Sequence, residues 1–526
     1  MRAKSDQSGY ANGDLAAAIG PAEQAISLRQ MLPLAKFFQC EDITVARMAL
    51  RVSDAMAGDL VVCRTGIDDP VALAAEALAR GAAGVLTEQI LPCPLPQAVV
   101  ADAVEAACQI ANRIEDNPAA ELLTIGVIGD AGKTSTAMLI AGLLKRIGVR
   151  TAFETELGSG DGIVQSVPQA ALSDGIELIS RLAAARDAGC GAMVIDLSGV
   201  APGSAYDVRW DMLVITGADA GPGTSTARSH FGPDPLTLAL EQAKQDAVVI
   251  LPSDRPKLLR RVTDAGLHCL TYGLRRPADL SAKVFDEQPG ETTLLVSCGD
   301  ETAMMRTGHC GEAFALNSLA AIAVGRLLET PLAAAVDHVA KLPTIPGRMQ
   351  RLSSWDTAAV VIDAAGTPER VSGTLRTLRR QRVRGGKLWC VLAISDPGSD
   401  AVATLVDTDR FSRFGRAIER FADRVVLTSA EDAKPTFLAS AHAVLDGFQD
   451  VAAARLVADP TRAISWAVRH AAPEDTIVIF AGDRCRTPSA RRLSAQNLER
   501  LVEEARRDPA VRHRTETSIL KMPRAV

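Results

Sequence analysis

The chain is poor in aromatic residues and carries no long run of basic ones. Phe, Trp and Tyr make up only 4% of its 526 residues, and the formal net charge is −6. Nucleic acids are usually bound by clustered Lys and Arg side chains together with aromatic rings on which bases stack. This composition therefore argues against a nucleic-acid partner.

Paired cysteines and long hydrophobic runs are also missing. The ten cysteines are scattered and no two form a Cys-x-x-Cys pair, so we expect free, buried thiols rather than a zinc site or a disulfide framework. No apolar run reaches the roughly 18 residues that a membrane span needs. The first residues, "MRAKSDQSGYANGD", lack the apolar core of a secretion signal. We expect a cytoplasmic protein with no membrane span.

Short apolar segments alternate with helical ones along most of the chain, which is 47% hydrophobic and long enough for two to four domains. This alternation predicts an α/β protein built on parallel sheets with helices on both faces. A hairpin is expected over residues 292–308 and two helices over 317–342. The strand-like runs are 192–198, 211–217, 247–254, 267–273, 359–366, 387–395, 423–430 and 475–483.

The segment "GVIGDAGKTST" (126–136) has the composition of a phosphate-binding loop. It lies between an expected strand and an expected helix, whose N-terminus would attract anions. Lys133 would reach the outer phosphates and the Thr134 hydroxyl would face Mg²⁺. The strict pattern requires a glycine where Val127 stands, so the alternative of a plain glycine-rich turn remains open. Asp196 ends a buried strand and is either a second Mg²⁺-directed group or a helix N-cap.

Three blocks separate by pattern. We expect a flexible tail over residues 1–25, a small N-terminal α/β domain over 26–117, a central parallel-sheet ATPase domain with the phosphate loop over 118–343, a C-terminal Rossmann-like domain over 344–505, and a second tail over 506–526. The segment "LPTIPGRM" (342–349) contains two prolines and a glycine and is the expected linker.

The order and spacing of five segments resemble the Mur ligase family, whose members use ATP to add amino acids to the peptidoglycan precursor. The chain is most similar to the tripeptide synthetase (MurE-type) branch, over roughly residues 45–505. The segments are "GVIGDAGKTST" (126–136), "RSHFGPDPLTLALEQAK" (228–244), "EAFALNSLAAIA" (312–323), "IPGRMQRL" (345–352) and "VVIDAAGTPERVSGTLRTLR" (360–379).

The resemblance implies a reaction and a site. ATP, with Mg²⁺, phosphorylates a terminal carboxylate of a UDP-MurNAc-peptide, and the amine of an amino acid then attacks this acyl phosphate. The first domain would be similar to a UDP-sugar-binding domain, and the protein is expected to be a monomer. The implied catalytic residues are Lys133, His230 and Lys244. The implied metal ligands are Thr134, Asp196, His230 and Lys244, the last if carbamylated. Ser166 and Ser198 are the expected substrate contacts. The implied ATP-binding residues are Gly129, Asp130, Ala131, Gly132, Lys133, Thr134, Ser135, Asn317, Arg348 and Asp363.

Several positions depart from the family pattern. Asp130 and Ala131 stand where Thr-Asn is usual, "DLSGV" (196–200) replaces Glu-Val-Ser-Ser-His, and "DAAGTP" (363–368) lacks the usual Tyr and His. Two hypotheses therefore stay open: an active amide ligase of altered specificity, and a catalytically impaired homologue that acts as an ATP-binding scaffold or regulator. An unrelated phosphate-loop switch is a third, which leaves the first and last blocks unexplained.

Overall fold

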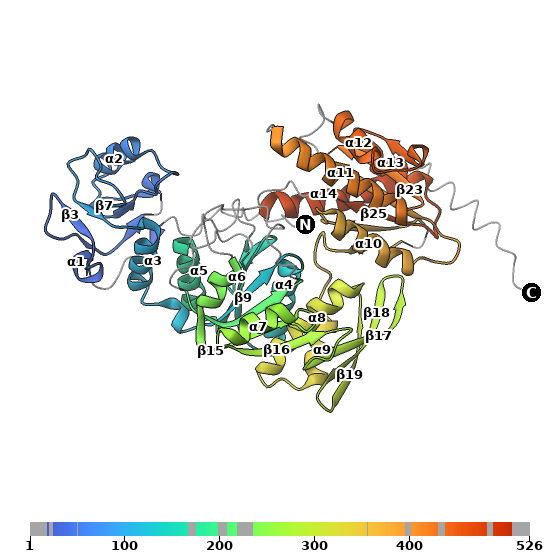
Figure 1. Ribbon diagram of the computed structural model, residues 1–526, viewed down its shortest axis with the longest axis horizontal. Helices are drawn as coiled ribbons and strands as arrows, with labels where there is room; N and C mark the ends of the chain where they lie inside the picture. The colour runs from blue at the N-terminus through green and yellow to red at the C-terminus, as the bar shows by residue number, and fades with distance from the viewer. Residues whose placement is uncertain are drawn as a thin grey trace, which may run out of the picture.

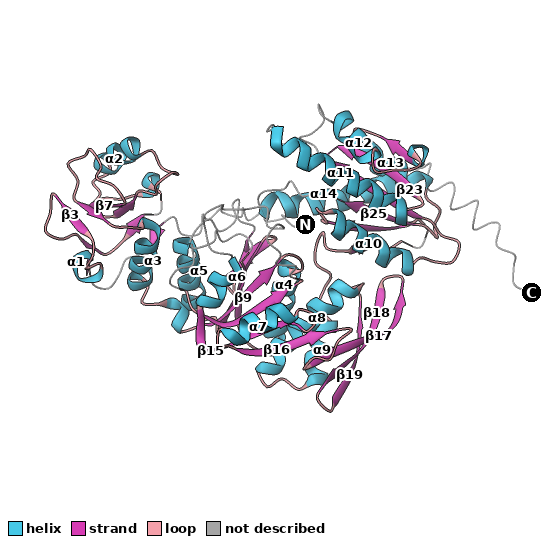
Figure 2. Ribbon diagram, in the orientation of Figure 1, coloured by secondary structure: helices cyan, strands magenta, loops and turns pink. Residues whose placement is uncertain are grey.

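The computed structural model describes residues 18–19, 25–49, 51–166, 175–197, 208–217, 235–354, 356–394, 401–429, 437–480 and 488–507. Within these residues the chain forms three main sheets, each with its own helices (Figures 1 and 2). The fold class is the α/β class that the sequence predicts. The expected tails over 1–25 and 506–526 lie largely outside the described residues, although Ala18–Ile19 pairs with Met48–Ala49 as a strand.

The N-terminal sheet has six short strands and is followed by a helix that leads into the central sheet. Helix α2 begins at Pro70, and the Asp69 side chain caps it by accepting from the N–H groups of Val71 and Ala72. The strands, in sheet order, are β1 (Ala18–Ile19), β5 (Met48–Ala49), β6 (Leu60–Val62), β7 (Gly84–Thr87), β8 (Gln97–Val99) and β3 (Lys36–Phe38). The other elements are β2 (Ile26–Ser27) paired with β4 (Thr44–Val45), and helices α1 (Leu28–Met31), α2 (Pro70–Ala79) and α3 (Ala103–Ile114).

The central sheet has eleven strands, and those from β10 to β17 are parallel. Strand β9 is buried between β13 and β14, which explains its continuous apolar sequence. In sheet order the strands are β12 (Gln165–Ser166), β11 (Gly158–Gly160), β10 (Thr151–Thr155), β13 (Ala192–Asp196), β9 (Leu123–Gly129), β14 (Trp210–Thr216), β15 (Ala243–Pro252), β16 (His268–Gly273), β17 (Leu280–Gln288), β18 (Glu291–Cys298) and β19 (Glu301–Thr307).

Helices cover both faces of the central sheet. One core cluster joins the sheet to α4 (Lys133–Arg146), α8 (Glu312–Leu327) and α9 (Leu332–Ala340). The other joins it to α5 (Gly175–Asp187), α6 (Pro235–Glu241), α7 (Pro256–Asp264) and α3, so this core is continuous with the N-terminal domain. The predicted hairpin is confirmed as β18 and β19, and the two predicted helices are α8 and α9.

The C-terminal sheet has six strands, of which β21, β25, β22, β23 and β24 are parallel. Helices α10, α11 and α12 share one core with the sheet, and α13 and α14 share the other. In sheet order the strands are β20 (Gln350–Leu352), β21 (Ala359–Asp363), β25 (Thr476–Phe480), β22 (Leu388–Ile394), β23 (Arg424–Ser429) and β24 (Ala454–Leu456). The helices are α10 (Pro368–Arg380), α11 (Ala401–Phe421), α12 (Phe437–Leu445), α13 (Pro460–His470) and α14 (Pro488–Arg507).

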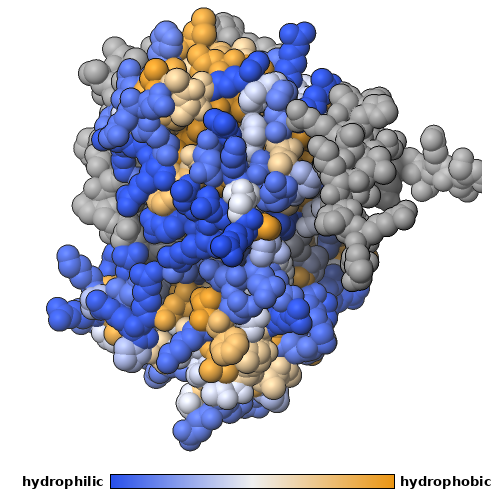
Figure 3. All heavy atoms as spheres, turned by 90° about the vertical axis from the view of Figure 1, so that its right-hand side faces the viewer, coloured by the Kyte–Doolittle hydropathy of each residue, from blue (hydrophilic) through white to orange (hydrophobic). Residues whose placement is uncertain are grey.

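The junction between the central and C-terminal parts is polar. Viewed from the side, a band of hydrophilic residues crosses the middle of the molecule, at the height where the C-terminal part meets the part below it (Figure 3). Arg380 of α10 lies 3.6 Å from the Glu312 carboxylate of α8, and Arg275 also pairs with Glu312, at 2.9 Å. Polar junctions of this kind are typical of domains that move relative to one another.

The described cysteines are free thiols, as predicted. None of the nine takes part in a disulfide, and five of them are buried. No helix among the described residues is long and apolar enough to cross a membrane.

Candidate active site

The turn between β9 and α4 places two glycines where other residues would not fit. Gly129 has φ 143° and Gly132 has φ 85°, a region that favours glycine. A Cβ at Gly129 would collide with the Thr216 carbonyl, and one at Gly132 would collide with the Asn317 carboxamide. The backbone therefore forms a tight cradle that opens onto the N-terminus of α4, which begins at Lys133. Such a cradle, at the carboxyl end of a central parallel strand, is where phosphate groups bind in this class of fold.

Two polar contacts organise the loop. The Lys133 ammonium donates to the Gly129 carbonyl at 2.6 Å, so the lysine lies folded over its own loop. The Thr134 hydroxyl donates to Asp196 Oδ2, also at 2.6 Å, and both side chains are buried. This bond joins α4 to the end of β13 and brings together two oxygen ligands of the kind that Mg²⁺ prefers.

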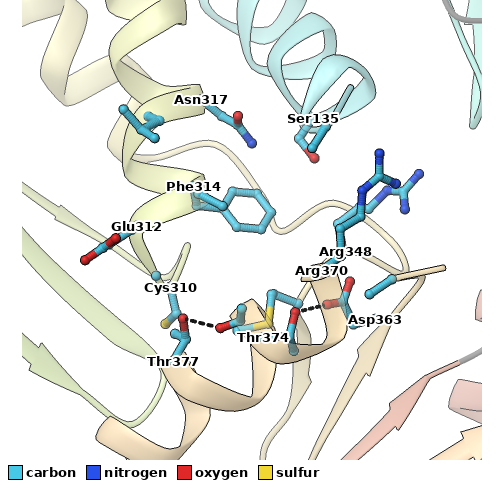
Figure 4. A pocket seen from close by; sticks show the side chains of 18 of the residues that line it. Ser135, Cys310, Glu312, Phe314, Asn317, Arg348, Asp363, Arg370, Thr374 and Thr377 are labelled. Atoms are coloured by element: carbon cyan, nitrogen blue, oxygen red, sulfur yellow. Dashed lines mark hydrogen bonds between the residues drawn. The ribbon is translucent and has the colours of Figure 1, made fainter. Parts of the chain in front are cut away.

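A cavity of about 480 Å³ extends from the loop towards the C-terminal sheet. Ala131 to Ser135 line one end, Asn317 lines the side formed by α8, and Arg348 and Asp363 line the side formed by the C-terminal part (Figure 4). Five of the seven predicted loop residues, Ala131 to Ser135, and the three predicted ATP contacts outside the loop thus line one cavity, whereas Gly129 and Asp130 do not line it. Its volume is typical of a site for a small molecule.

Arg348 and Asp363 are held by different partners. The Arg348 guanidinium lies 3.1 Å from the Glu156 carboxylate, across the cavity, and also donates to the Ala364 carbonyl at 3.4 Å. Asp363 accepts a hydrogen bond from the Thr374 hydroxyl at 2.5 Å. Burial raises the pKa of the Asp363 carboxyl, while the hydrogen bond from Thr374 and the charge of Arg348 act in the opposite direction.

The structure adds residues that the sequence analysis missed. Arg370 donates to the backbone carbonyl of Asp130, so α10 contacts the loop directly. Thr374 and Thr377 line the cavity from the same helix, and Phe314 lines it from α8. One signal was present: Arg370, Thr374 and Thr377 recur at helical spacing just after Pro368, which begins the helix.

The structure does not bring Lys244 to the loop. Lys244 lies at the start of β15, where Trp210 of β14 pairs with Ala243, whereas Thr216 at the other end of β14 pairs with Gly129. Six residues of strand separate these two ends, a distance of about 20 Å. Lys244 instead forms an ion pair with Asp211 at 2.6 Å. The expectation that Lys244 is a catalytic residue and metal ligand beside the loop is therefore corrected. Because β15 begins at Ala243, Lys244 lies at the amino-terminal edge of the parallel strands, whereas the loop lies at their carboxyl-terminal edge.

Of the three remaining predicted residues, the structure describes one. Ser166 ends the edge strand β12, where it pairs with Ser159. His230 and Ser198 lie outside the described residues. Among the residues that the structure does describe, no group of three or more His, Cys, Asp and Glu side chains is arranged to hold a metal ion.

Comparison with known proteins identifies the family. The family profile described as "Mur ligase, glutamate ligase domain" matches residues 347–483. The chain is 30% identical, over 381 residues, to the UDP-N-acetylmuramoyl-L-alanyl-D-glutamate–2,6-diaminopimelate ligase of Ralstonia nicotianae, covering 68% of this chain and 70% of that protein. The chain belongs to the Mur ligase family. The ligase of the same name from Streptomyces coelicolor is 28% identical to this Mur ligase over 428 residues, covering 77% of this chain and 80% of the relative.

Solved structures share the fold of this Mur ligase. A UDP-N-acetylmuramoyl-L-alanyl-D-glutamate–2,6-diaminopimelate ligase matches with a TM-score of 0.61 and 21% identity, covering 91% of this chain and 100% of that chain. A MurF enzyme from Acinetobacter baumannii matches with a TM-score of 0.63 and 17% identity, covering 92% and 100%. A MurF ligase from Thermotoga maritima, solved in complex with ADP, matches with a TM-score of 0.60 and 17% identity, covering 87% and 98%.

Proposed function

We propose that this Mur ligase binds ATP and Mg²⁺ in the cavity between the central and C-terminal sheets and uses them to form an amide bond. The carboxylate substrate is a UDP-MurNAc-peptide of the kind that the names of its relatives specify, and the amine is that of an amino acid. The observation that carries the proposal is the Thr134–Asp196 hydrogen bond beside the glycine cradle, inside a cavity that Asn317, Arg348 and Asp363 also line.

The residues of the cavity suit a nucleotide. A triphosphate requires backbone N–H groups and cations, which the start of α4, Lys133, Arg348 and Arg370 supply. Lys133 would exchange its bond with the Gly129 carbonyl for phosphate oxygens. Arg348 would likewise move from Glu156 to the nucleotide. Both changes are rearrangements of side chains that already line the cavity.

The Thr134–Asp196 pair suits Mg²⁺. Both groups offer oxygen ligands, and the threonine hydroxyl can turn its proton away from the metal while Asp196 supplies the negative charge. When bound, the metal would neutralise charge on the phosphates as a carboxylate approaches them. The residues of this chain hold the nucleotide, orient the acceptor and exclude water as the domains close.

One chain supplies every residue that lines the cavity, so we propose that the protein works as a monomer. ATP and the proposed substrates are small molecules of the cytoplasm, and we place the reaction there. The amine is the variable of the experiment.

The test is a ligation assay with a panel of amines. Purified protein is incubated with ATP, Mg²⁺, UDP-MurNAc-L-Ala-D-Glu and individual amino acids, including 2,6-diaminopimelate and lysine, and phosphate release is measured. We expect release that depends on both the UDP-linked acceptor and one amine, with a new peptide detected by mass spectrometry. The Lys133→Ala variant should show no release.

Nucleotide binding without release in the presence of any acceptor and amine would contradict the ligase proposal and favour an ATP-binding scaffold. The Glu–Val–Ser–Ser–His stretch of the family, replaced here by residues 196–200, is the sequence feature that would explain such a result.

A further inference from the structure

A second cavity, of about 620 Å³, lies between the N-terminal domain and the central sheet. Asn112 and Arg113 of α3, together with Asn117, line it from the N-terminal side, and Arg209 and Lys244 line it from the central sheet. Arg209 precedes β14 and Lys244 begins β15, so the cavity lies at the amino-terminal edge of the parallel strands. It is therefore separated from the phosphate loop by the length of the sheet.

A polar network holds Lys244, one of the residues that line this cavity. Lys244 Nζ donates to Asp211 Oδ1 at 2.6 Å, and Asp211 Oδ2 accepts from both the backbone N–H and the hydroxyl of Thr124, at 2.9 and 2.8 Å. Three donors thus hold one carboxylate, and the carboxylate in turn fixes the position of the ammonium group. An ammonium group carries three donors, of which Asp211 occupies one in this structure.

The charges around the cavity favour an anion. Arg113, Arg209 and Lys244 are three cations, of which Arg113 lies 3.9 Å from the Asp116 carboxylate and Lys244 pairs with Asp211. Among these described residues, the two carboxylates leave an excess of one positive charge around the cavity. Arg209 is exposed and donates to the Glu241 carbonyl at 2.9 Å, which anchors the guanidinium at the cavity rim. Asn112 adds a carboxamide that is only 6% exposed. Cations and amide groups that converge on one cavity are the usual partners of phosphate and carboxylate groups.

We propose that this cavity binds a small anionic ligand that carries a phosphate or carboxylate group. The volume lies within the range of small-molecule sites in proteins. Arg209, which donates to a backbone carbonyl, contributes the positive charge that is not paired with a carboxylate among the residues that the structure describes, and Arg113 and Lys244 contribute two paired cations. The proposal does not depend on the proposed ligase function, because no residue of the phosphate loop takes part.

The bound anion would join two parts of the chain. Arg113 belongs to the N-terminal domain, whereas Arg209 and Lys244 belong to the central sheet. The segment at Asn117 leads through residues 118–122 into β9, whose other end carries the phosphate loop. An anion held by both sides would therefore fix the N-terminal domain relative to the strand that carries the loop.

The test measures anion binding by calorimetry in the Lys133→Ala background, which removes the main cation of the phosphate loop. Inorganic phosphate and citrate are titrated separately, so that the phosphate and carboxylate chemistries are distinguished. We expect at least one of them to bind, and the added Arg113→Gln and Arg209→Gln substitutions to weaken that binding by at least about tenfold, as expected for the loss of two charge-assisted contacts. Arg260→Gln, which replaces an exposed arginine on α7, is the matched control and should leave the affinity unchanged.

Arg113→Gln alone keeps the experiment valid if Arg209 is needed for folding, because the Arg113 side chain is 67% exposed. Its effect should also be a loss of affinity. Absence of binding of both anions at millimolar concentration, or equal affinity in the Arg113→Gln and Arg260→Gln variants, would overturn the proposal.

Discussion

Thr134 and Thr136 carry the same side chain two residues apart on α4, and their surroundings differ. The Thr134 hydroxyl donates to Asp196. The Thr136 hydroxyl is fully buried and has no hydrogen-bond partner in the described part of the chain. The two residues therefore contrast a hydroxyl that contacts the proposed metal-binding carboxylate with one that makes no hydrogen bond to a described residue.

Thr134→Val should weaken Mg²⁺-dependent binding of an ATP analogue by at least about tenfold, because it removes a proposed metal ligand and the hydroxyl that donates to the buried Asp196. Thr136→Val should leave that binding unchanged and keep or slightly raise the melting temperature, because a buried hydroxyl without a partner is costly. Calorimetric titrations with and without Mg²⁺ measure both. Equal losses in the two variants would contradict the assignment of Thr134.

Glu154 on β10 is a buried carboxylate whose titration affects stability. Burial raises its pKa from the ordinary 4.5 to about 7, although the charge of Arg181, 3.9 Å away, lowers it and that of Glu177 raises it. The folded state therefore holds a proton that the unfolded state releases at lower pH. The contribution of Glu154 to the free energy of unfolding is at most about 3 kcal/mol. It is fully present below about pH 4.5 and is lost as the pH rises through about 7.

Glu154→Gln should accordingly gain stability relative to the natural chain as the pH increases. Urea unfolding at pH 5 and pH 8 measures the effect, and the advantage of the variant should be larger at pH 8. An advantage that is the same at both values, or larger at pH 5, would show that Glu154 is ionised in the folded protein at both.

At the scale of elements, the segment from α9 to β20 connects the two sheets that enclose the cavity. Gly347 adopts φ 67°, which a glycine tolerates without strain, and Arg348 follows it directly. Arg348 reaches back to Glu156, which follows β10, so this ion pair ties the connecting segment to the central sheet. Both side chains are partly buried, and the pair contributes about 1 kcal/mol or less.

Nucleotide binding should require Arg348 to leave Glu156. Glu156→Gln is therefore expected to raise the affinity for an ATP analogue by roughly two- to fivefold, whereas Arg348→Ala should lower it. Fluorescence or calorimetric titration of the two variants decides the matter. A lower affinity in Glu156→Gln would mean that Glu156 positions Arg348 for the nucleotide instead of holding it away.

The elements also show how far the sequence predicts the site. The phosphate loop could be found because its glycines, Lys133 and Thr134 are adjacent in the chain and flanked by a clear strand and helix. The position of Lys244 could not, because it depends on where β15 begins after residues 218–234, which lie outside the described part. Glu156 was missed because its role arises from a contact across the cavity, which no local pattern records. Arg370 shares a helical face with Thr374 and Thr377, but that spacing does not show that the face lies against the loop.

At the scale of the whole molecule, the cavity exists only because two sheets face each other across a polar junction. The central sheet supplies the phosphate loop and Asn317, and the C-terminal part supplies Arg348, Asp363 and Arg370. Neither part encloses a nucleotide alone. A nucleotide bound between them should therefore draw the two parts together.

The most direct test of this account is the binding of a nonhydrolysable ATP analogue in the presence of Mg²⁺, measured by calorimetry on the natural chain and on Lys133→Ala. The account predicts one binding site per chain in the natural protein and a loss of affinity of at least about tenfold in the variant. Absence of binding to the natural chain, or the same affinity in both proteins, would contradict the claim that the loop after β9 holds the nucleotide.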